Sequence, residues 1–203
     1  MGHNTLLIAL ITILLACNNS AENRSSNTSA SQSTPDTTGK AKQYFPVLDF
    51  LKSEILSVDS LPVGIRKIVI NNEVKDSGYA SLDEFHSYAD EFISPELDPR
   101  VFPDNYRESG FYDRSTRSST FMYEALKSEL PIRRIDVQSK ATDTYDKVFH
   151  LYVERIEQKG DSTIIRKMTW KPGYFLQVNE SRSLRDKETI RQVKLVWNNW
   201  EQE

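Results

Sequence analysis

Cysteine, glycine and histidine are scarce in this chain of 203 residues, and each scarcity excludes a class of site. A single cysteine, Cys17, cannot form an intrachain disulfide or a cysteine-based metal cluster. The seven glycines are widely spaced, which excludes the glycine-rich loops that cradle phosphates and the nucleophile elbow of many hydrolases. The formal net charge of −3 argues against a dedicated nucleic-acid binder, which would present a strongly basic surface.

Histidine chemistry is equally limited, because the chain has three histidines and no H-E-x-x-H pattern. His86 and Asp90 lie one helical turn apart, where we expect an exposed hydrogen-bonded pair rather than a metal site. Catalytic groups that meet only in space, such as a Ser-His-Asp triad or paired carboxylates, leave no local pattern. The sequence therefore leaves enzymatic activity undecided, while it predicts no catalytic residue, no metal site and no cofactor.

A short hydrophobic run at residues 6–16 stands directly before Cys17. As a helix it spans about 16 Å, too short for a bilayer core of roughly 30 Å but typical of a signal peptide. Its last residues, Leu14-Leu15-Ala16-Cys17, resemble the lipobox of bacterial lipoprotein precursors. The resemblance implies a lipoprotein signal peptide at 1–16, cleavage before Cys17, and membrane attachment through lipid (palmitate included) on Cys17. The alternative is a buried N-terminal helix with an incidental cysteine.

Residues 17–42 follow as a stretch rich in Ser, Thr and Asn, without an aromatic side chain. Such a segment has too little apolar surface to offset its ordering entropy, so we expect a disordered tether. At about 25–30 Å from end to end, it would hold a domain away from a membrane surface. By analogy with lipoprotein sorting, Asn18 instead of Asp favours the outer membrane of the cell envelope over the inner membrane.

The remaining residues, 43–203, read as a single α+β domain that begins with two helices. The first follows from apolar residues at helical spacing between Leu48 and Val58. The second begins with a capping box, in which Ser81 and Glu84 satisfy free amides of the first turn. It is expected to stop at Ser94-Pro95, and residues 95–115 read as irregular because of their prolines and glycine.

Beyond this irregular stretch the hydrophobic period changes from that of a helix to that of a strand. Short turns such as Lys159-Gly160-Asp161 and Pro172-Gly173 require antiparallel neighbours. The predicted fold is therefore two N-terminal helices packed on a curved antiparallel meander sheet of about six or seven strands. Its strands are expected at 65–70, 116–126, 132–140, 147–157, 163–171, 174–181 and 189–197.

Two neighbouring strands carry the best candidates for a ligand-facing surface. Phe149, Leu151 and Val153 are expected on the core face of one strand, which leaves its other face polar. Such a polar row can bind a polar ligand, although a solvated sheet face reads the same way. Rings at Trp170, Tyr174 and Phe175 flank a turn and suggest either a sugar platform or core packing. The candidate residues alternate along the two strands: Arg134, Asp136 and Gln138 on one, and His150, Tyr152 and Glu154 on the other.

The body resembles uncharacterised envelope lipoproteins of diderm bacteria, through the lipobox and looser patterns at 67–72, 83–85 and 168–174. These relatives imply a location but no activity. We expect a lipid-anchored envelope protein, a non-catalytic binding module whose partner is an envelope protein, a lipid or a polysaccharide and not a nucleic acid. Two alternatives remain: a carrier or receptor for a lipid or other apolar ligand, and a hydrolase with a dispersed carboxylate site.

Overall fold

A computed structural model describes residues 44–142, 146–185 and 187–198. The predicted signal peptide, Cys17 and the predicted tether lie outside the described residues. None of the helices in the described ranges has the length and hydrophobicity needed to cross a bilayer.

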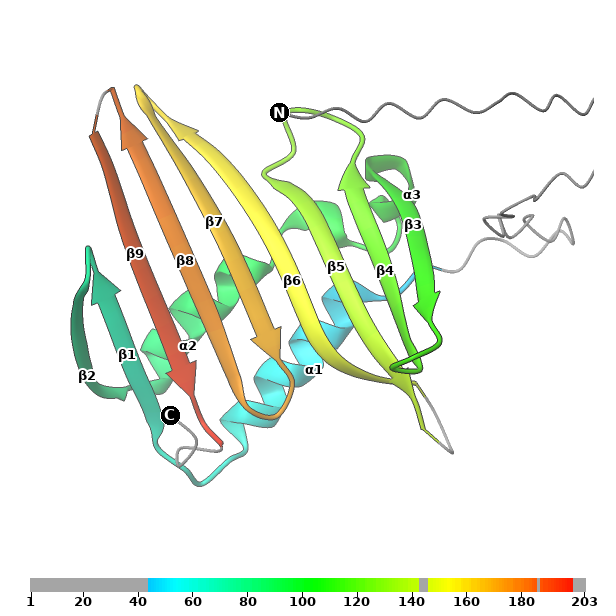
Figure 1. Ribbon diagram of the computed structural model, residues 1–203, viewed down its shortest axis with the longest axis horizontal. Coiled ribbons are helices and arrows are strands. Elements are labelled where there is room, and N and C mark those ends of the chain that lie inside the picture. Colours follow the sequence, from blue (N-terminus) through cyan, green and yellow to red (C-terminus); the bar gives the residue numbers. More distant parts are fainter. Residues whose placement is uncertain (1–43, 143–145, 186, 199–203) are drawn as a thin grey trace, which may run out of the picture. The chain divides into compact units, whose positions relative to one another are not determined.

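Strands dominate the described part of the chain and form one twisted sheet (Figure 1). All neighbouring strands are antiparallel, in the order β2-β1-β9-β8-β7-β6-β5-β4-β3. Consecutive strands from β3 to β9 are neighbours, and the early β1–β2 hairpin is added beside the last strand. The strand bounds are β1 Ile65–Asn71, β2 Val74–Ala80, β3 Tyr106–Asp113, β4 Ser118–Ala125, β5 Ile132–Ala141, β6 Asp146–Lys159, β7 Ser162–Lys171, β8 Phe175–Leu184 and β9 Lys187–Val196.

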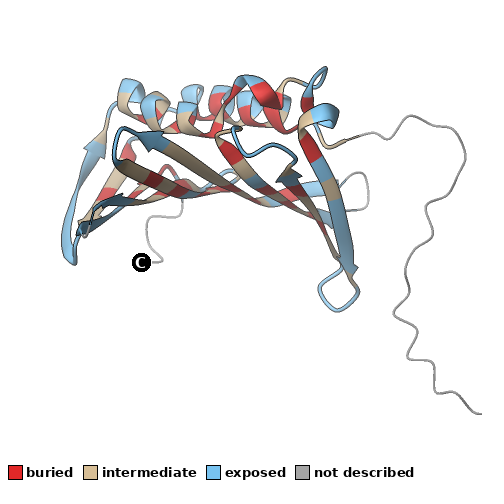
Figure 2. Cartoon of the chain, turned by 90° about the horizontal axis from the view of Figure 1, so that it is seen from above, coloured by how far each residue is buried: buried red, intermediate tan, exposed pale blue. Residues whose placement is uncertain are grey.

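Three short α-helices lie on one face of this sheet: α1 (Val47–Asp59), α2 (Leu82–Ala89) and α3 (Phe102–Asn105). Figure 2 shows the helices as one layer and the sheet as the other, with buried residues where the two meet. We call the face under the helices the inner face and the opposite one the outer face. Short 3-10 turns at Asp90–Phe92 and Pro95–Leu97 connect α2 to α3.

The predicted architecture is wrong in its strand number and in its helix placement. The sheet has nine strands rather than six or seven, and β1 and β2 separate α1 from the other helices, so the helices do not form an N-terminal pair. The two strands that were not predicted, β2 and β3, form the two edges of the sheet. Most of their residues are exposed, so the apolar alternation that identifies a half-buried strand is missing from their sequences.

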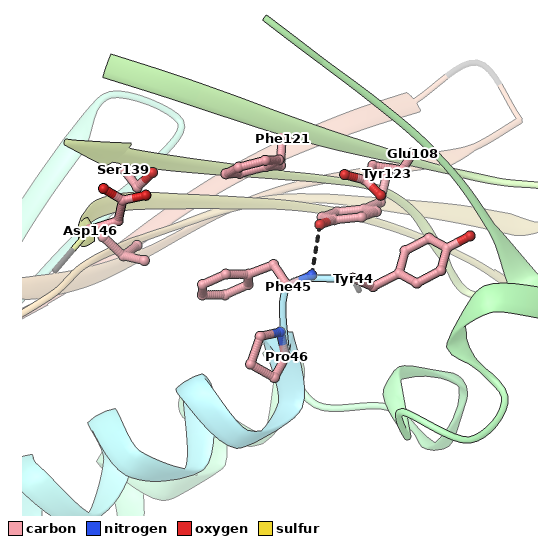
Figure 3. A pocket seen from close by; sticks show the side chains of 9 residues that line it. Tyr44, Phe45, Pro46, Glu108, Phe121, Tyr123, Ser139 and Asp146 are labelled. Atoms are coloured by element: carbon pink, nitrogen blue, oxygen red, sulfur yellow. Dashed lines mark hydrogen bonds between the residues drawn. The ribbon is translucent and has the colours of Figure 1, made fainter. Parts of the chain in front are cut away.

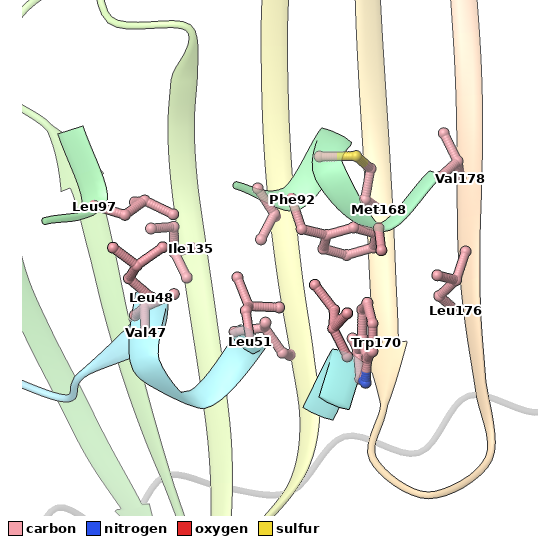
Figure 4. Close-up of a cluster of buried hydrophobic side chains, with 14 of the residues drawn as sticks. Val47, Leu48, Leu51, Phe92, Leu97, Ile135, Met168, Trp170, Leu176 and Val178 are labelled. Carbon is pink, nitrogen blue, oxygen red and sulfur yellow. The ribbon is translucent and has the colours of Figure 1, made fainter. Parts of the chain in front are cut away.

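The core fills the space between the helices and the inner face. Leu51 of α1, Phe92 and Trp170 of β7 are fully buried and point into this layer (Figure 4). Trp170 packs edge-on against Phe92, with ring centroids 5.3 Å apart, and its indole N–H donates to Glu54 of α1 at 3.3 Å. A fully buried side chain of this size stabilises the fold by roughly 1.5–3 kcal/mol. Trp170 is therefore a core residue and cannot take part in the suggested sugar platform.

Charged groups also attach the helical layer to the sheet. Arg166 of β7, with a side chain 10% exposed, donates to Glu157 of β6 and Glu180 of β8, both at 2.9 Å. It also lies 3.5 Å from Glu91 in the 3-10 turn after α2. Arg155 contacts both Glu157, at 2.7 Å, and the backbone carbonyl of Glu91, at 3.0 Å. We call these five residues the inner ion network.

Candidate functional site

The outer face carries the residues that the sequence analysis selected. The register of β5 with β6 sets Arg134 opposite Glu154, Asp136 opposite Tyr152, and Gln138 opposite His150. Because side chains alternate along each strand, all six point away from the helices. In Figure 1 the strands stand in front of the helices, so this helix-free face is turned toward the reader. Together these residues line a shallow hollow of about 390 Å3, which we call the polar hollow: Arg134, Asp136, Gln138, His150, Tyr152 and Glu154.

Most charges in the polar hollow are matched within it. Arg134 binds Asp136 in a two-point contact, with Nε–Oδ1 at 2.8 Å and Nη2–Oδ2 at 2.9 Å. The Tyr152 hydroxyl donates to Glu154 at 3.1 Å. Burial, together with the nearby Glu154 charge, raises the pKa of Tyr152 to about 12, so the phenol stays protonated at neutral pH. The hollow therefore offers neutral donors and acceptors beside paired charges.

His150 differs from the other residues of the polar hollow because one of its ring nitrogens is left without a hydrogen-bond partner within the described ranges. Its Nδ1 atom is buried and has no hydrogen-bond partner among the described residues. Burial lowers the pKa of His150 below its ordinary value, against the opposing effect of Asp136, so the imidazole is neutral at pH 7. A neutral imidazole offers one donor and one acceptor nitrogen. A ligand that reaches Nδ1 would satisfy an atom that the fold leaves without a partner.

A second hollow adjoins the first and shares Gln138 with it. It has a volume of about 530 Å3 and contains two exposed rings, Phe111 at 58% and Phe149 at 41% exposure. We call it the aromatic hollow, and the two hollows together the outer-face groove. Phe111 of β3 lies in register with Thr120 of β4, which lies in register with Gln138. The aromatic hollow is lined by Phe111, Asp113, Thr116, Ser118, Thr120, Gln138, Lys140 and Phe149.

Phe149 is placed there by a β-bulge, and its predicted position on the core face is wrong. Gln138 pairs with His150 while Ser139 pairs with Val148, which leaves Phe149 as an extra residue in β6. An extra residue breaks the alternation of faces at that point. Leu151 and Val153, beyond the bulge, remain buried in the core as expected. The sequence carries no signal for this bulge, and Phe111 lies on a strand that the sequence did not predict.

Other candidates take structural roles. His86 does not pair with Asp90; its Nε2 atom lies 2.9 Å from Asp59 Oδ1 at the end of α1. Tyr174 and Phe175 each have a lysine ammonium over the ring, from Lys171 at 4.7 Å and Lys194 at 4.6 Å respectively. Across the described ranges there is no group of three or more His, Cys, Asp and Glu side chains suited to hold a metal ion.

Comparison of the chain with protein-family models, with curated proteins and with solved structures found no match in any of the three. The functional argument for this chain therefore stands on its own residues.

Proposed function

We propose that this protein is a lipid-anchored envelope binding module that holds a neutral oligosaccharide chain in the outer-face groove. One observation carries the proposal: exposed aromatic rings at one end of the groove are continuous with paired polar groups at the other. The anchor is the lipid expected on Cys17, and the partner is a polysaccharide of the cell envelope.

The chemistry of a saccharide matches this combination. A sugar ring has an apolar C–H face that can lie on the rings of Phe111 and Phe149, which already stand exposed. Its hydroxyls both donate and accept, and Gln138, His150 and Glu154 supply complementary groups. Each hollow falls within the volume range of small-molecule sites, about 300–1,000 Å3.

Neutral ligands are favoured because Arg134 and the three carboxylates of the groove already have partners, which leaves Lys140 as the other charged side chain of its described lining. Arg134 is neutralised by Asp136, and Glu154 accepts from Tyr152. At the aromatic end, hydrogen bonds from Ser115 and Thr116 lower the pKa of Asp113 to about 2. An ionic ligand that pairs with Arg134 or with these carboxylates would have to displace these contacts, whereas a polyhydroxylated chain can add hydrogen bonds to them.

The proposal is tested with neutral β-linked tetrasaccharides of glucose, N-acetylglucosamine and mannose, titrated into the full chain at millimolar concentration. Residue-resolved NMR should show shifts at β3–β6 on the outer face for at least one of them. Phe111→Ala and Phe149→Ala should each weaken its binding about tenfold, the equivalent of roughly 1.4 kcal/mol of lost stacking.

Tyr79→Ala is the matched control, because Tyr79 is 72% exposed on the opposite edge strand β2. It should leave saccharide binding unchanged. Equal losses in all three variants, or no shifts on the outer face with any tetrasaccharide, would overturn the proposal. Shortened products after long incubation would also overturn it, because they would make the groove a hydrolase site.

A further inference from the structure

A separate pocket lies on the inner face, next to the segment that precedes α1. It has a volume of about 410 Å3 and is bounded by the segment Tyr44–Pro46 on one side and by strands β3–β6 on the other (Figure 3). We call it the inner-face pocket. The described residues that line it are Tyr44, Phe45, Pro46, Glu108, Phe121, Tyr123, Ser139, Asp146 and Val148.

Four of its nine described lining residues are aromatic. Phe45 and Phe121 lie on opposite sides of the space, one from the segment before α1 and the other from β4 (Figure 3). The backbone N–H of Phe45 donates to the Tyr123 hydroxyl at 3.1 Å, which fixes this segment against the sheet. Burial raises the pKa of Tyr123 to about 12, so its ring carries no negative charge at neutral pH.

The polar groups of the pocket come from the strands. Ser139 is only 4% exposed, and its Oγ atom has no hydrogen-bond partner in the described part of the chain. A buried hydroxyl without a partner is costly, so a ligand that contacts it would recover free energy. Two acidic side chains, Glu108 and Asp146, also line the pocket, and its described lining includes no basic side chain.

We propose that the inner-face pocket binds a small aromatic or apolar amine in its ammonium form. The rings would surround the apolar body and attract the cation through their faces. Glu108 and Asp146 would neutralise the ammonium, and Ser139 would accept a hydrogen bond from it. A fatty acid or other apolar anion is disfavoured, because it would place a third negative charge beside two carboxylates in a partly buried space.

This pocket is independent of the outer-face groove. Gln138 and Ser139 are adjacent on β5 and point to opposite faces of the sheet, one into each site. Saccharide binding and amine binding can therefore succeed or fail separately.

Three probes with one aromatic body test the proposal: naphthylethylammonium, naphthylethanol and naphthylacetate. Each is titrated into the full chain by calorimetry, and NMR locates the binding residues. The ammonium should bind at least tenfold more tightly than the alcohol, with the acetate weakest, and its shifts should fall on Phe45, Phe121 and Ser139. Equal affinity for all three, tighter binding of the acetate, or shifts elsewhere would overturn the proposal.

Two conservative variants isolate the polar contacts. Glu108→Gln keeps the shape and removes the charge, and should weaken ammonium binding about tenfold while leaving the alcohol unchanged. Ser139→Ala should weaken ammonium binding roughly threefold, without lowering the melting temperature, because no internal hydrogen bond is lost. Glu124→Gln, on the outer face of the same sheet, is the matched control and should bind like the wild type.

If Glu108→Gln fails to fold, as judged by its NMR spectrum, Asp146→Asn replaces it, since Asp146 is exposed at the start of β6. Loss of charge discrimination in that variant supports the proposal, and unchanged discrimination contradicts it.

Discussion

Backbone strain in this fold is found at non-glycine residues with positive φ. The β1–β2 hairpin turns at Asn72 and Glu73, both of which have positive φ, at 41° and 78°. Positive φ at both central residues is typical of the type I′ turn, which suits a two-residue hairpin. Asn-Gly is the preferred pair for this turn. Asn72 fits this turn, and its side-chain oxygen accepts from the Ile190 N–H of β9 at 3.2 Å. Glu73 lacks glycine's freedom, so it adopts a costly conformation.

Glu73→Gly should therefore stabilise the protein by about 1 kcal/mol, because it removes the strain of a left-handed non-glycine residue. The free energy of unfolding in urea measures the effect. Asp161→Gly is the control, since Asp161 occupies a two-residue turn with negative φ, where glycine gains nothing. If both substitutions changed stability equally, the strain argument would be wrong.

The elements that sequence analysis identified are those that bury one face. The Ser81 half of the predicted capping box was confirmed, since Ser81 accepts from the Glu84 N–H at 3.1 Å, whereas the Glu84 carboxylate accepts from Lys67 at 2.8 Å. The turn at Pro172-Gly173 was also confirmed: the Tyr174 N–H donates to the Lys171 carbonyl, and Gly173 has φ of 76°. Strands β2 and β3 were missed, because an edge strand exposed on both faces has no alternation to detect.

The same limit applies to the candidate site. The polar hollow could be predicted because Arg134, Asp136, His150, Tyr152 and Glu154 alternate with buried residues on adjacent strands. The aromatic hollow could not, because it depends on one bulge and on an edge strand. The inner-face pocket combines segments that are far apart in sequence, and no local pattern records such a meeting.

Between elements, the inner ion network makes stability depend on pH. Burial by itself would raise the pKa of Glu157, but hydrogen bonds from Arg166 and Arg155 outweigh it and hold the pKa below its ordinary value. A depressed carboxyl pKa stabilises the folded state above the unfolded pKa, about 4.3, and that contribution is lost as pH falls through the folded value. The network should therefore weaken only in acid.

Glu157→Gln should cost about 1–3 kcal/mol of unfolding free energy at pH 7, because Arg155 and Arg166 lose a charged acceptor. As pH falls from about 4.3 through the lower folded-state pKa, the difference from the wild type should shrink, since the wild-type carboxyl takes up its proton over this range. Urea denaturation at pH 7 and across this range measures it. A difference that stays constant with pH would show that the ionised form of Glu157 adds nothing to stability.

For the molecule as a whole, the proposed anchor would determine where the two proposed binding faces operate. Cys17 lies outside the described residues, and its lipidation remains a prediction from the lipobox. Cys17→Ala should leave the folded body unchanged, remove the lipid and leave the first 16 residues uncleaved. Fractionation and mass spectrometry of the N-terminus test it. A variant that stays on membranes and still loses those residues would refute lipidation.

The segment Tyr44–Pro46 joins the folded body to the chain that would lead to this anchor. It also forms a wall of the inner-face pocket, held to β4 by the hydrogen bond from Phe45 to Tyr123. On its other side it borders a hollow of about 330 Å3 with Leu97 and Phe102. Any mechanical load on the N-terminal chain therefore acts on a pocket wall before it reaches the sheet. Tension between a membrane and a bound polymer would therefore act first on the inner-face pocket and on the amine proposed to bind there.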